Sequence, residues 1–261
     1  RVMRWGSSDA NNPQFEVDNN GAPLKDITSI ALEYEMAYAV NKQGQVYQWD
    51  LDPNARIHPV SLVKDKNGKP IVDVTKIVTG PNHTLALTKK GNMYAWGNNN
   101  QYQLGDPKLE ENNTVINYAN YVKLGNAPLG NIKDIAINFY SSYALTQSGN
   151  VYAWGNNGLG LLGDGVNNPA GTRTGVPRLV VSESGQDKLS DVVAITGMEE
   201  GVLALKSNGT IVGWGRNWHG RLTQDDRKQG DGDDYAYPVL IQKSKGKALN
   251  IGNLNAFTKL N

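Results

Sequence analysis

The sequence contains no cysteine, which excludes disulfides, thiolate metal sites and cysteine nucleophiles. Only three histidines occur among the 261 residues, and none stands in a ligand spacing such as H-E-x-x-H. We therefore expect neither a bound metal ion nor another cofactor. The absence of cysteine is compatible with the cytosol and with a bacterial exterior.

An excess of charge of one sign is also missing, because 26 Lys and Arg residues stand against 25 Asp and Glu residues, for a net charge of +1. Such a chain has no overall field to hold nucleic acid or an anionic membrane. No apolar run approaches the roughly 18 residues of a membrane span. We expect neither nucleic-acid binding nor membrane insertion.

Signatures of catalysis are absent as well. The sequence has no G-x-S-x-G elbow, no phosphate-binding G-x-x-x-x-G-K-S/T and no dinucleotide fingerprint. The acidic group Asp231, Asp233 and Asp234 lacks the rest of a calcium loop and is typical of a solvated loop. These observations predict that the protein is not an enzyme.

What the sequence has instead is an internal repeat. Residues 93–106 read MYAWGNNNQYQLGD and residues 151–164 read VYAWGNNGLGLLGD. In four segments an Ala stands five residues before a Gly, and the Gly stands five residues before a Trp; the segments are AVNKQGQVYQW (39–49), ALTKKGNMYAW (86–96), ALTQSGNVYAW (144–154) and ALKSNGTIVGW (204–214). A fixed unit that recurs in this way is typical of stacked repeat architectures.

Each repeat predicts four strands. The first follows Asp26, Asp73, Asn131 or Asp191, the second is the Ala-Leu segment, and a two-residue Gly turn leads into the third. The fourth strand is expected at 58–63, 120–124, 176–181 and 237–242. Four antiparallel strands per unit of about 40 to 50 residues indicate an all-β fold, a β-propeller in which each unit is one blade.

The expected blade units of this single domain, 1–261, are approximately 1–25, 26–72, 73–130, 131–190 and 191–249, with the start of a further unit at 250–261. Residues 1–5 match the third strand of a blade and residues 250–261 match a first strand. This pattern favours a piece of a larger ring of six or seven blades. A closed five-bladed ring is the alternative.

The motif Tyr-Ala-Trp-Gly-Asn-Asn followed by Leu-Gly, downstream of Ala-Leu-x-x-x-Gly, resembles the blade signature of the regulator of chromosome condensation family of propellers. The resemblance covers essentially the whole chain. It implies a protein-interaction scaffold, because members of the family act as the exchange factor for the GTPase Ran, as a secreted bacterial inhibitor of β-lactamases and as interaction modules. The chain resembles the bacterial inhibitor most, whose aromatic bends between strands one and two contact its partner.

The repeated tryptophans have a structural explanation. A Trp at one point of the third strand fills the gap between neighbouring blades, and the Gly that follows lets backbones approach. We expect this packing role for Trp5, Trp49, Trp96, Trp154 and Trp214.

One face is the candidate binding surface. In an antiparallel blade, the bends between strands one and two and the inserts between strands three and four emerge on the same side. The inserts 97–119, 155–175 and 215–236 are rich in Asn, Gly, Asp and Tyr, as recognition loops are. The residues expected to contact a partner protein are Tyr34, Glu35, Asn82, Phe139, Tyr140, Glu199, Glu200, Tyr102, Trp218, His219 and Tyr235.

Alternatives remain open at this point. The same face could bind a carbohydrate or the cell wall through Tyr, Trp218, Asn and Asp side chains, or the chain could be a GTPase exchange factor or a chromatin-binding module. The Asn-rich, cysteine-free composition predicts a secreted protein or one at the surface of a bacterium, with the cytoplasm as the alternative.

Overall fold

The computed structural model describes residues 2–4, 14–18, 21–33, 35–51, 59–109, 115–166, 172–220, 222, 234–244 and 247–249. Within these ranges the regular structure is β-strand, apart from two short 3-10 helices, η1 (Gly158–Gly160) and η2 (Trp218–Gly220). No helix in the described ranges is long and apolar enough to cross a membrane. The predicted all-β class is confirmed.

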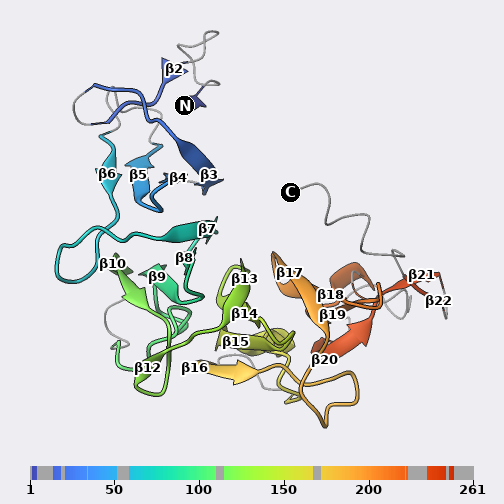
Figure 1. Cartoon of the computed structure of the whole chain (residues 1–261). Helices are drawn as coiled ribbons and strands as arrows, with labels where there is room; N and C mark the ends of the chain where they lie inside the picture. The colour runs from blue at the N-terminus through green and yellow to red at the C-terminus, as the bar shows by residue number, and fades with distance from the viewer. Residues whose placement is uncertain are drawn as a thin grey trace.

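Four four-stranded antiparallel sheets form the body of the molecule. They follow one another along an arc, with the first strand of each sheet toward the centre and the fourth toward the outside (Figure 1). In chain order the sheets are β3 (Ile27–Leu32), β4 (Met36–Asn41), β5 (Val46–Asp50) and β6 (Ser61–Leu62); β7 (Val74–Thr79), β8 (His83–Thr88), β9 (Met93–Asn98) and β10 (Val115–Tyr121); β13 (Ile132–Ile137), β14 (Ser141–Thr146), β15 (Val151–Asn156) and β16 (Arg173–Leu179); and β17 (Val192–Met198), β18 (Gly201–Lys206), β19 (Ile211–Gly215) and β20 (Tyr235–Leu240).

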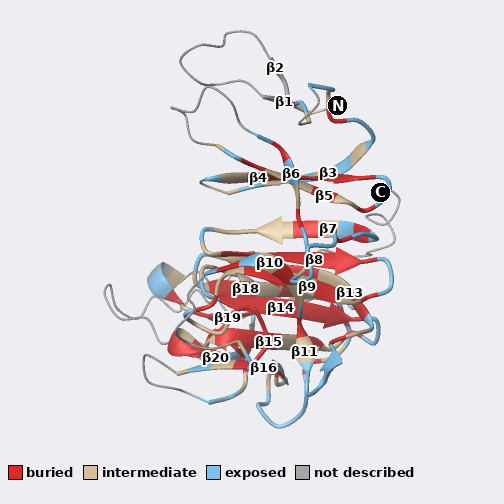
Figure 2. Cartoon of the chain, turned by 90° about the vertical axis from the view of Figure 1, so that its left-hand side faces the viewer, coloured by how far each residue is buried: buried red, intermediate tan, exposed pale blue. Residues whose placement is uncertain are grey.

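Each sheet is one propeller blade, and in the first three blades the second strand is the most buried part. Every residue of β8 and β14 is buried, because these strands are covered on both faces by neighbouring sheets. Figure 2 shows this burial along the middle strands, whereas most residues of the bends and Gly turns at the ends of the sheets are half-buried or exposed. A strand buried on both faces explains why the Ala-Leu segments are continuously apolar instead of alternating.

In three of the four blades the fourth strand begins and ends earlier than the sequence predicts, whereas β6 lies within the predicted segment 58–63. The predicted segment 120–124 corresponds to β10 at Val115–Tyr121, and the predicted segment 176–181 corresponds to β16 at Arg173–Leu179. The cause is a small hairpin that follows each fourth strand and takes up the end of the predicted segment. Two of these hairpins contain strands, β11 (Lys123–Leu124) with β12 (Ala127–Pro128) and β21 (Gln242–Ser244) with β22 (Lys247–Ala248), and two have isolated bridges, Lys64 with Pro70 and Val181 with Lys188.

The first described residues repeat this pattern. β1 (Met3–Arg4) pairs with β2 (Gln14–Phe15), and Val17 bridges to Pro23 in a further hairpin. The N–H of Glu16 donates to the carbonyl of Val2 at 3.1 Å, as the N–H of Val63 donates to that of Val46 at 2.8 Å. β1 therefore occupies the third-strand position that the sequence assigns to residues 1–5. Trp5 and residues 250–261 lie outside the described residues.

The glycine turn between the second and third strands has three residues, so the predicted two-residue turn is wrong. The N–H of Asn41 donates to the carbonyl of Gln45 at 3.1 Å, and Gly44 at φ +70° closes the loop by donating to Asn41 at 2.8 Å. A type I turn followed by a left-handed glycine has this pattern. The repeated glycine is thus required by the backbone conformation.

The same turn is hydrogen-bonded to the first strand of the next blade. The carbonyl of Gly44 accepts from the N–H of Val74 at 3.1 Å, and Gly91 and Gly149 accept in the same way from Ile132 and Val192. The residue that precedes each of these donor N–H groups has a positive φ near +60°. Asp and Asn tolerate this conformation better than most residues. This geometry accounts for the recurring acidic or amide residue before each first strand, which is Asp26, Asp73, Asn131 or Asp191.

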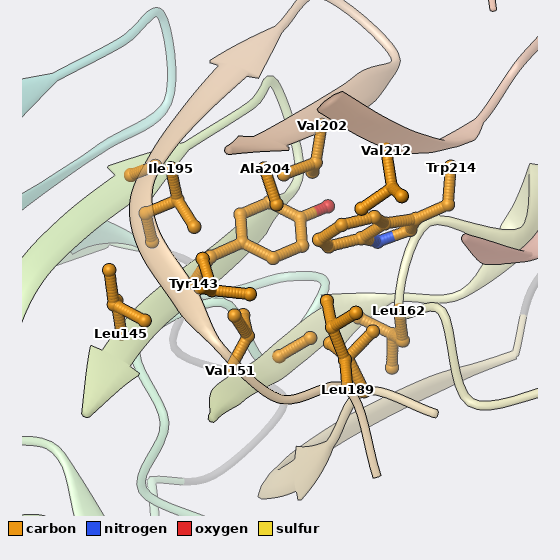
Figure 3. Packing of buried hydrophobic residues seen from close by; sticks show 14 residues of the cluster. Tyr143, Leu145, Val151, Leu162, Leu189, Ile195, Val202, Ala204, Val212 and Trp214 are labelled. Atoms are coloured by element: carbon orange, nitrogen blue, oxygen red, sulfur yellow. The ribbon is translucent and has the colours of Figure 1, made fainter. Parts of the chain in front are cut away.

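Buried apolar residues form four clusters between successive sheets, and each cluster contains one repeat tryptophan, Trp49, Trp96, Trp154 or Trp214. In the cluster of Figure 3, Trp214 of the fourth sheet meets Tyr143 of the third edge-to-face, with ring centroids 6.1 Å apart. The glycine after each Trp approaches the bend of its own blade, since a Cβ on Gly155 would lie 2.5 Å from the carbonyl oxygen of Tyr140. In the first blade Asp50 takes this position.

Candidate functional site

The bends between first and second strands lie beside the starts of the inserts. The N–H of Asn98 donates to the carbonyl of Asn82 at 2.7 Å, and the N–H of Asn156 donates to that of Tyr140 at 3.1 Å. Bends and inserts therefore emerge at the same end of the sheets. We call this surface the loop face and define it by the described residues of the bends 33–35, 80–82, 138–140 and 199–200 and of the inserts that follow β9, β15 and β19.

Neighbouring bends are hydrogen-bonded to one another in a row. The Asn82 amide donates to the carbonyl of Phe139 at 2.8 Å, and the N–H of Phe139 donates to the carbonyl of Glu199 at 3.3 Å. At the other end of the row, the Thr79 hydroxyl donates to the Glu33 carboxylate at 3.0 Å. The row, which we call the inner row, is fixed in shape before any partner arrives.

Two aromatic side chains stand at the middle of the inner row. The rings of Phe139 and Tyr140 meet edge-to-face with centroids 6.1 Å apart, and Tyr140 is 40% exposed. The buried side chain of Asn138 supports them, because its oxygen accepts from the N–H groups of Tyr140 at 3.1 Å and Ser141 at 2.7 Å. This turn chemistry holds the bend in one conformation.

The fourth blade adds a stack of three side chains. The Arg216 guanidinium pairs with the Glu200 carboxylate at 2.6 Å and lies over the Trp218 ring, 4.9 Å from its centroid. Trp218 begins η2 and is 39% exposed. The corresponding positions of the other blades hold Asn100 and Gly158, so blade packing does not require a Trp here.

A second arginine lies over a strained tyrosine. Tyr102 adopts φ +62°, whereas the equivalent positions in the next two blades hold Gly160 at +70° and Gly220 at +68°. A left-handed non-glycine residue costs about 1 to 2 kcal/mol. The Arg173 guanidinium stacks 5.0 Å from the Tyr102 ring centroid and donates to the Asn100 carbonyl at 3.0 Å. Because strain of this kind gathers at functional positions, Tyr102 is a notable part of the loop face.

The first residues of the inserts after β9, β15 and β19 are hydrogen-bonded to buried residues of the core. The side-chain oxygens of Asn99, Asn157 and Asn217 each accept the N–H of a buried leucine five residues later, at 3.1, 3.0 and 2.9 Å. The tryptophan of the next blade then donates to the insert, since the Trp154 indole N–H reaches the carbonyl of Gln103 at 2.9 Å. This contact explains the second Asn and the Leu-Gly of the repeat motif.

The surroundings of His83 indicate a structural role for this residue. It is buried, its Nε2 lies 2.8 Å from the Ser142 hydroxyl, and that hydroxyl donates to the carbonyl of Gln103 at 2.7 Å. Burial lowers the pKa of His83 to about 3, so the imidazole is neutral at physiological pH. Among the described residues no group of three metal-ligating side chains occurs.

Acidic side chains border the inner row. Glu35 and Glu199 are exposed, and Glu33 is half-buried. Burial raises the pKa of Glu33, the hydrogen bond from Thr79 opposes this, and the neighbouring charge of Glu35 raises it further. The positive charge of Arg216 is compensated by Glu200.

The structure thus brings six of the predicted residues onto one continuous stretch of the loop face, namely Asn82, Phe139, Tyr140, Glu199, Glu200 and Trp218. Tyr102 lies in the insert of the second blade, and Tyr235 begins β20, where its backbone packs against Gly160 of the third insert. Glu35 lies in the bend of the first blade. Tyr34 and the side chain of His219 lie outside the described residues.

The sequence prediction missed Arg173 and Arg216, which orient the two exposed aromatics. The internal repeat carries a signal for one of them, since Arg216 stands where the other blades have Asn98 and Asn156.

Models of the regulator of chromosome condensation (RCC1) repeat match residues 74–103 and 132–160, and residues 90–127 and 148–197. Residues 74–127 and 132–197 of this propeller are therefore RCC1 repeats. The curated relatives of this RCC1-repeat chain include protein pim1 of Schizosaccharomyces pombe, 34% identical over 152 residues, which are 57% of this chain and 25% of pim1. The probable E3 ubiquitin-protein ligase HERC4 of Mus musculus is 35% identical over 118 residues, which are 45% of this chain and 10% of HERC4.

Solved structures show the same fold. Prp20p from Saccharomyces cerevisiae superposes with a TM-score of 0.63 at 18% identity, covering 94% of this chain and 59% of Prp20p. Human WBSCR16 gives 0.62 at 18% identity, covering 90% and 56%. The RCC1-repeat chain therefore spans a quarter or less of these curated relatives and just over half of these structures. All four proteins are eukaryotic, and they lend no support to a special likeness with the bacterial inhibitor.

Proposed function

We propose that the protein is a non-enzymatic scaffold that binds a partner protein through the loop face. The observation that carries this proposal is the inner row, in which hydrogen bonds between adjacent bends, Asn82 to Phe139 and Phe139 to Glu199, hold exposed aromatic side chains in one fixed arrangement. A surface that is ordered in advance loses little conformational entropy on binding.

The exposed side chains have the character of interface anchors. Tyr, Trp and Arg are the residues that most often dominate the binding energy of protein interfaces. On the loop face Tyr140 and Trp218 are each about two-fifths exposed, and Arg216 and Arg173 hold aromatic rings in place by stacking. Glu35 and Glu199 supply negative charge at the border, which favours a partner with basic residues there.

Proteins of the same fold bind other proteins. One solved structure is described together with the binding of Prp20p to Gsp1p and histones, and another shows Kap60 bound to yeast RCC1 (Prp20). These descriptions support protein binding as the function class. They also make a GTPase or histones reasonable first probes, and exchange-factor or chromatin-binding activity is the second candidate.

The experiment uses p-benzoylphenylalanine, a photo-cross-linking amino acid, placed at Tyr140 of the full chain. The matched control carries it at Ser148, in the Gly turn at the opposite end of the same blade. In an extract of the cells that make the protein, irradiation should join a polypeptide of defined mass to position 140 and not to position 148. Excess unlabelled chain should abolish the product, whereas excess Trp218→Ala chain should compete less well.

Equal products at both positions, or none at position 140, would contradict the proposal. A glycan array run on the same chain tests the carbohydrate alternative, which predicts saccharide binding that Trp218→Ala removes. The secreted or bacterial-surface location remains a prediction from composition, and a leader or anchor sequence in the gene would test it.

A further inference from the structure

A cavity of about 280 Å³ opens on the second blade at the side opposite the loop face. One wall is the hairpin that leads into this blade, around Asp65 and Lys69, and another is the Gly turn at Lys90. Tyr94 of β9 and Tyr121 of β10 form the aromatic part of the lining, and Asp73 lies at the start of the first strand. The lining is mainly polar. No part of the cavity belongs to the loop face.

Tyr121 is not required by the fold. Tyr94 and Tyr121 are paired across β9 and β10, their rings stack with centroids 4.4 Å apart, and the Tyr94 hydroxyl donates to that of Tyr121 at 2.8 Å. The same register position in the other blades pairs Tyr152 with Leu179, Val212 with Leu240 and Tyr47 with Leu62. Leucine therefore satisfies blade packing at the position of Tyr121, and a half-exposed tyrosine there needs another explanation.

Asp65 is held in place at the mouth of the cavity. One carboxylate oxygen accepts the N–H groups of Asn67 at 2.9 Å and Lys69 at 3.0 Å, which fixes the side chain at the mouth of the hairpin. The same turn recurs in other hairpins, where Asp18 accepts the N–H of Ala22 and Ser182 stands at the equivalent position. Asp65 thus follows the repeat, and Tyr121 is the departure that distinguishes this cavity.

The charges of the lining balance. Asp65 and Asp73 are acidic, and Lys69 and Lys90 are basic. Within the described ranges none of these four side chains forms an ion pair with another residue. Burial and the hydrogen bond with Tyr121 raise the pKa of Tyr94, so its phenol is neutral at physiological pH and able to donate or accept.

We infer that this cavity binds a neutral, hydroxyl-rich ligand, a single sugar unit, free or at the end of a glycan. Carboxylates accept hydrogen bonds from ligand hydroxyls, ammonium groups and the Asn92 amide donate to them, and the tyrosines offer an apolar surface to the C–H face of a sugar ring. The balanced charges give no net attraction for a phosphate or a cation. A volume near the lower end of the roughly 300 to 1,000 Å³ of ligand pockets selects a small ligand.

The test is saturation-transfer NMR on the full chain with a panel of neutral methyl glycosides, followed by titration of any that respond. The variants are Tyr121→Leu, which installs the residue of the other blades, and Asp65→Ser, which installs the residue that Ser182 supplies in the hairpin after the third blade and keeps a side-chain oxygen for the turn. The control is Tyr152→Leu, at the position of Tyr94 in the third blade. We expect at least one methyl glycoside to bind wild type and the control alike, and each of the two variants to weaken that binding tenfold or more without lowering the melting temperature.

Three results would overturn the inference. They are no saturation transfer from any methyl glycoside at about 10 mM, binding that Tyr121→Leu and Asp65→Ser leave unchanged, and a preference for glycine betaine or sugar phosphates, added as charged comparators, over every neutral glycoside. The site is independent of the loop face, so Trp218→Ala should leave sugar binding at this cavity unaltered.

Discussion

At the scale of single residues, the repeat tryptophans contribute to stability through packing between blades. Trp154 is fully buried, its indole N–H is bonded to Gln103 of the preceding blade, and Gly105 packs against its ring. The sequence identified this role because packing repeats at a fixed position in every blade. It could not identify the hydrogen-bond partner, which comes from an insert of variable length.

Truncation of such a residue should be costly. We expect Trp154→Ala to lower the free energy of unfolding by about 3 to 5 kcal/mol, as buried aromatic truncations do. Urea denaturation followed by circular dichroism measures the change. A loss below about 1 kcal/mol would show that the ring is not part of the cooperative core.

His83 should make stability depend on pH. Its pKa is near 6.5 when unfolded and falls to about 3 in the folded chain, so between these values the unfolded state binds more protons. The contribution of His83 to the free energy of unfolding is fully present above about pH 6.5. It is lost as the pH falls toward 3, by about 1.4 kcal/mol per pH unit. In chemical denaturation at pH 6 and pH 4, His83→Gln should show a smaller loss than wild type. Equal losses would contradict the neutral, buried imidazole.

Substitution of Tyr102 should affect binding of the partner but not the stability of the fold. Since Gly160 and Gly220 occupy its position in other blades, Tyr102→Gly relieves the left-handed strain while it removes the stacking with Arg173. These effects, each on the order of 1 kcal/mol, oppose one another. We expect the melting temperature to change little while affinity for the cross-linked partner falls, and a large destabilisation with unchanged affinity would assign Tyr102 a structural role.

At the scale of elements, the sequence predicted the blade strands from register but missed the hairpins between blades. The hairpin segments KDKNGKP and SESGQDK are polar and lack an alternating pattern, so they read as plain turns. A signal was nevertheless present, because a buried apolar residue recurs two positions before each Asp or Asn of the first strand, as Leu24, Ile71, Leu129 and Leu189. Predicted inserts and bends were placed at the correct end of the sheets, since antiparallel connectivity determines it.

The glycine turns join adjacent blades, and this can be tested with a pair of glycines. A Cβ on Gly44 would lie 2.4 Å from the backbone nitrogen of Val74, whereas a Cβ on Gly68, also at positive φ, would meet nothing within 4 Å. Gly68→Ala should therefore cost only about 1 to 2 kcal/mol, the left-handed penalty. Gly44→Ala should cost clearly more in the same denaturation assay, and equal losses would mean that the turn does not clamp the blades.

At the scale of the whole molecule, the repeated scaffold explains the fold but not the function. Packing dictates the Trp, Gly and Asp positions of every blade, so those positions carry no information about a partner. We expect function to depend on the positions where one blade departs from the others, which are Trp218, Tyr102 and Tyr121. Only the first of these departures is visible as an extra tryptophan in the sequence, because recognising the other two requires the backbone angle of Tyr102 and the cross-strand register of Tyr121.

The balanced charge of the chain also leads to a prediction. With 26 basic and 25 acidic residues, and with acidic side chains bordering the inner row, we expect too little net positive charge for DNA binding driven by the release of counterions. Fluorescence anisotropy with labelled duplex DNA should detect no binding at physiological salt. Submicromolar binding that weakens steeply with added salt would contradict this expectation.

The most direct measurement of the central claim is the dissociation constant of the partner captured at position 140, for wild type, Tyr140→Ala, Trp218→Ala and the opposite-side control Ser148→Ala. If the loop face binds the partner, each aromatic truncation should weaken binding tenfold or more, about 1.4 kcal/mol or more, with the melting temperature nearly unchanged and the control equal to wild type. Unaltered affinity in both aromatic variants would contradict the assignment of the loop face as the binding surface.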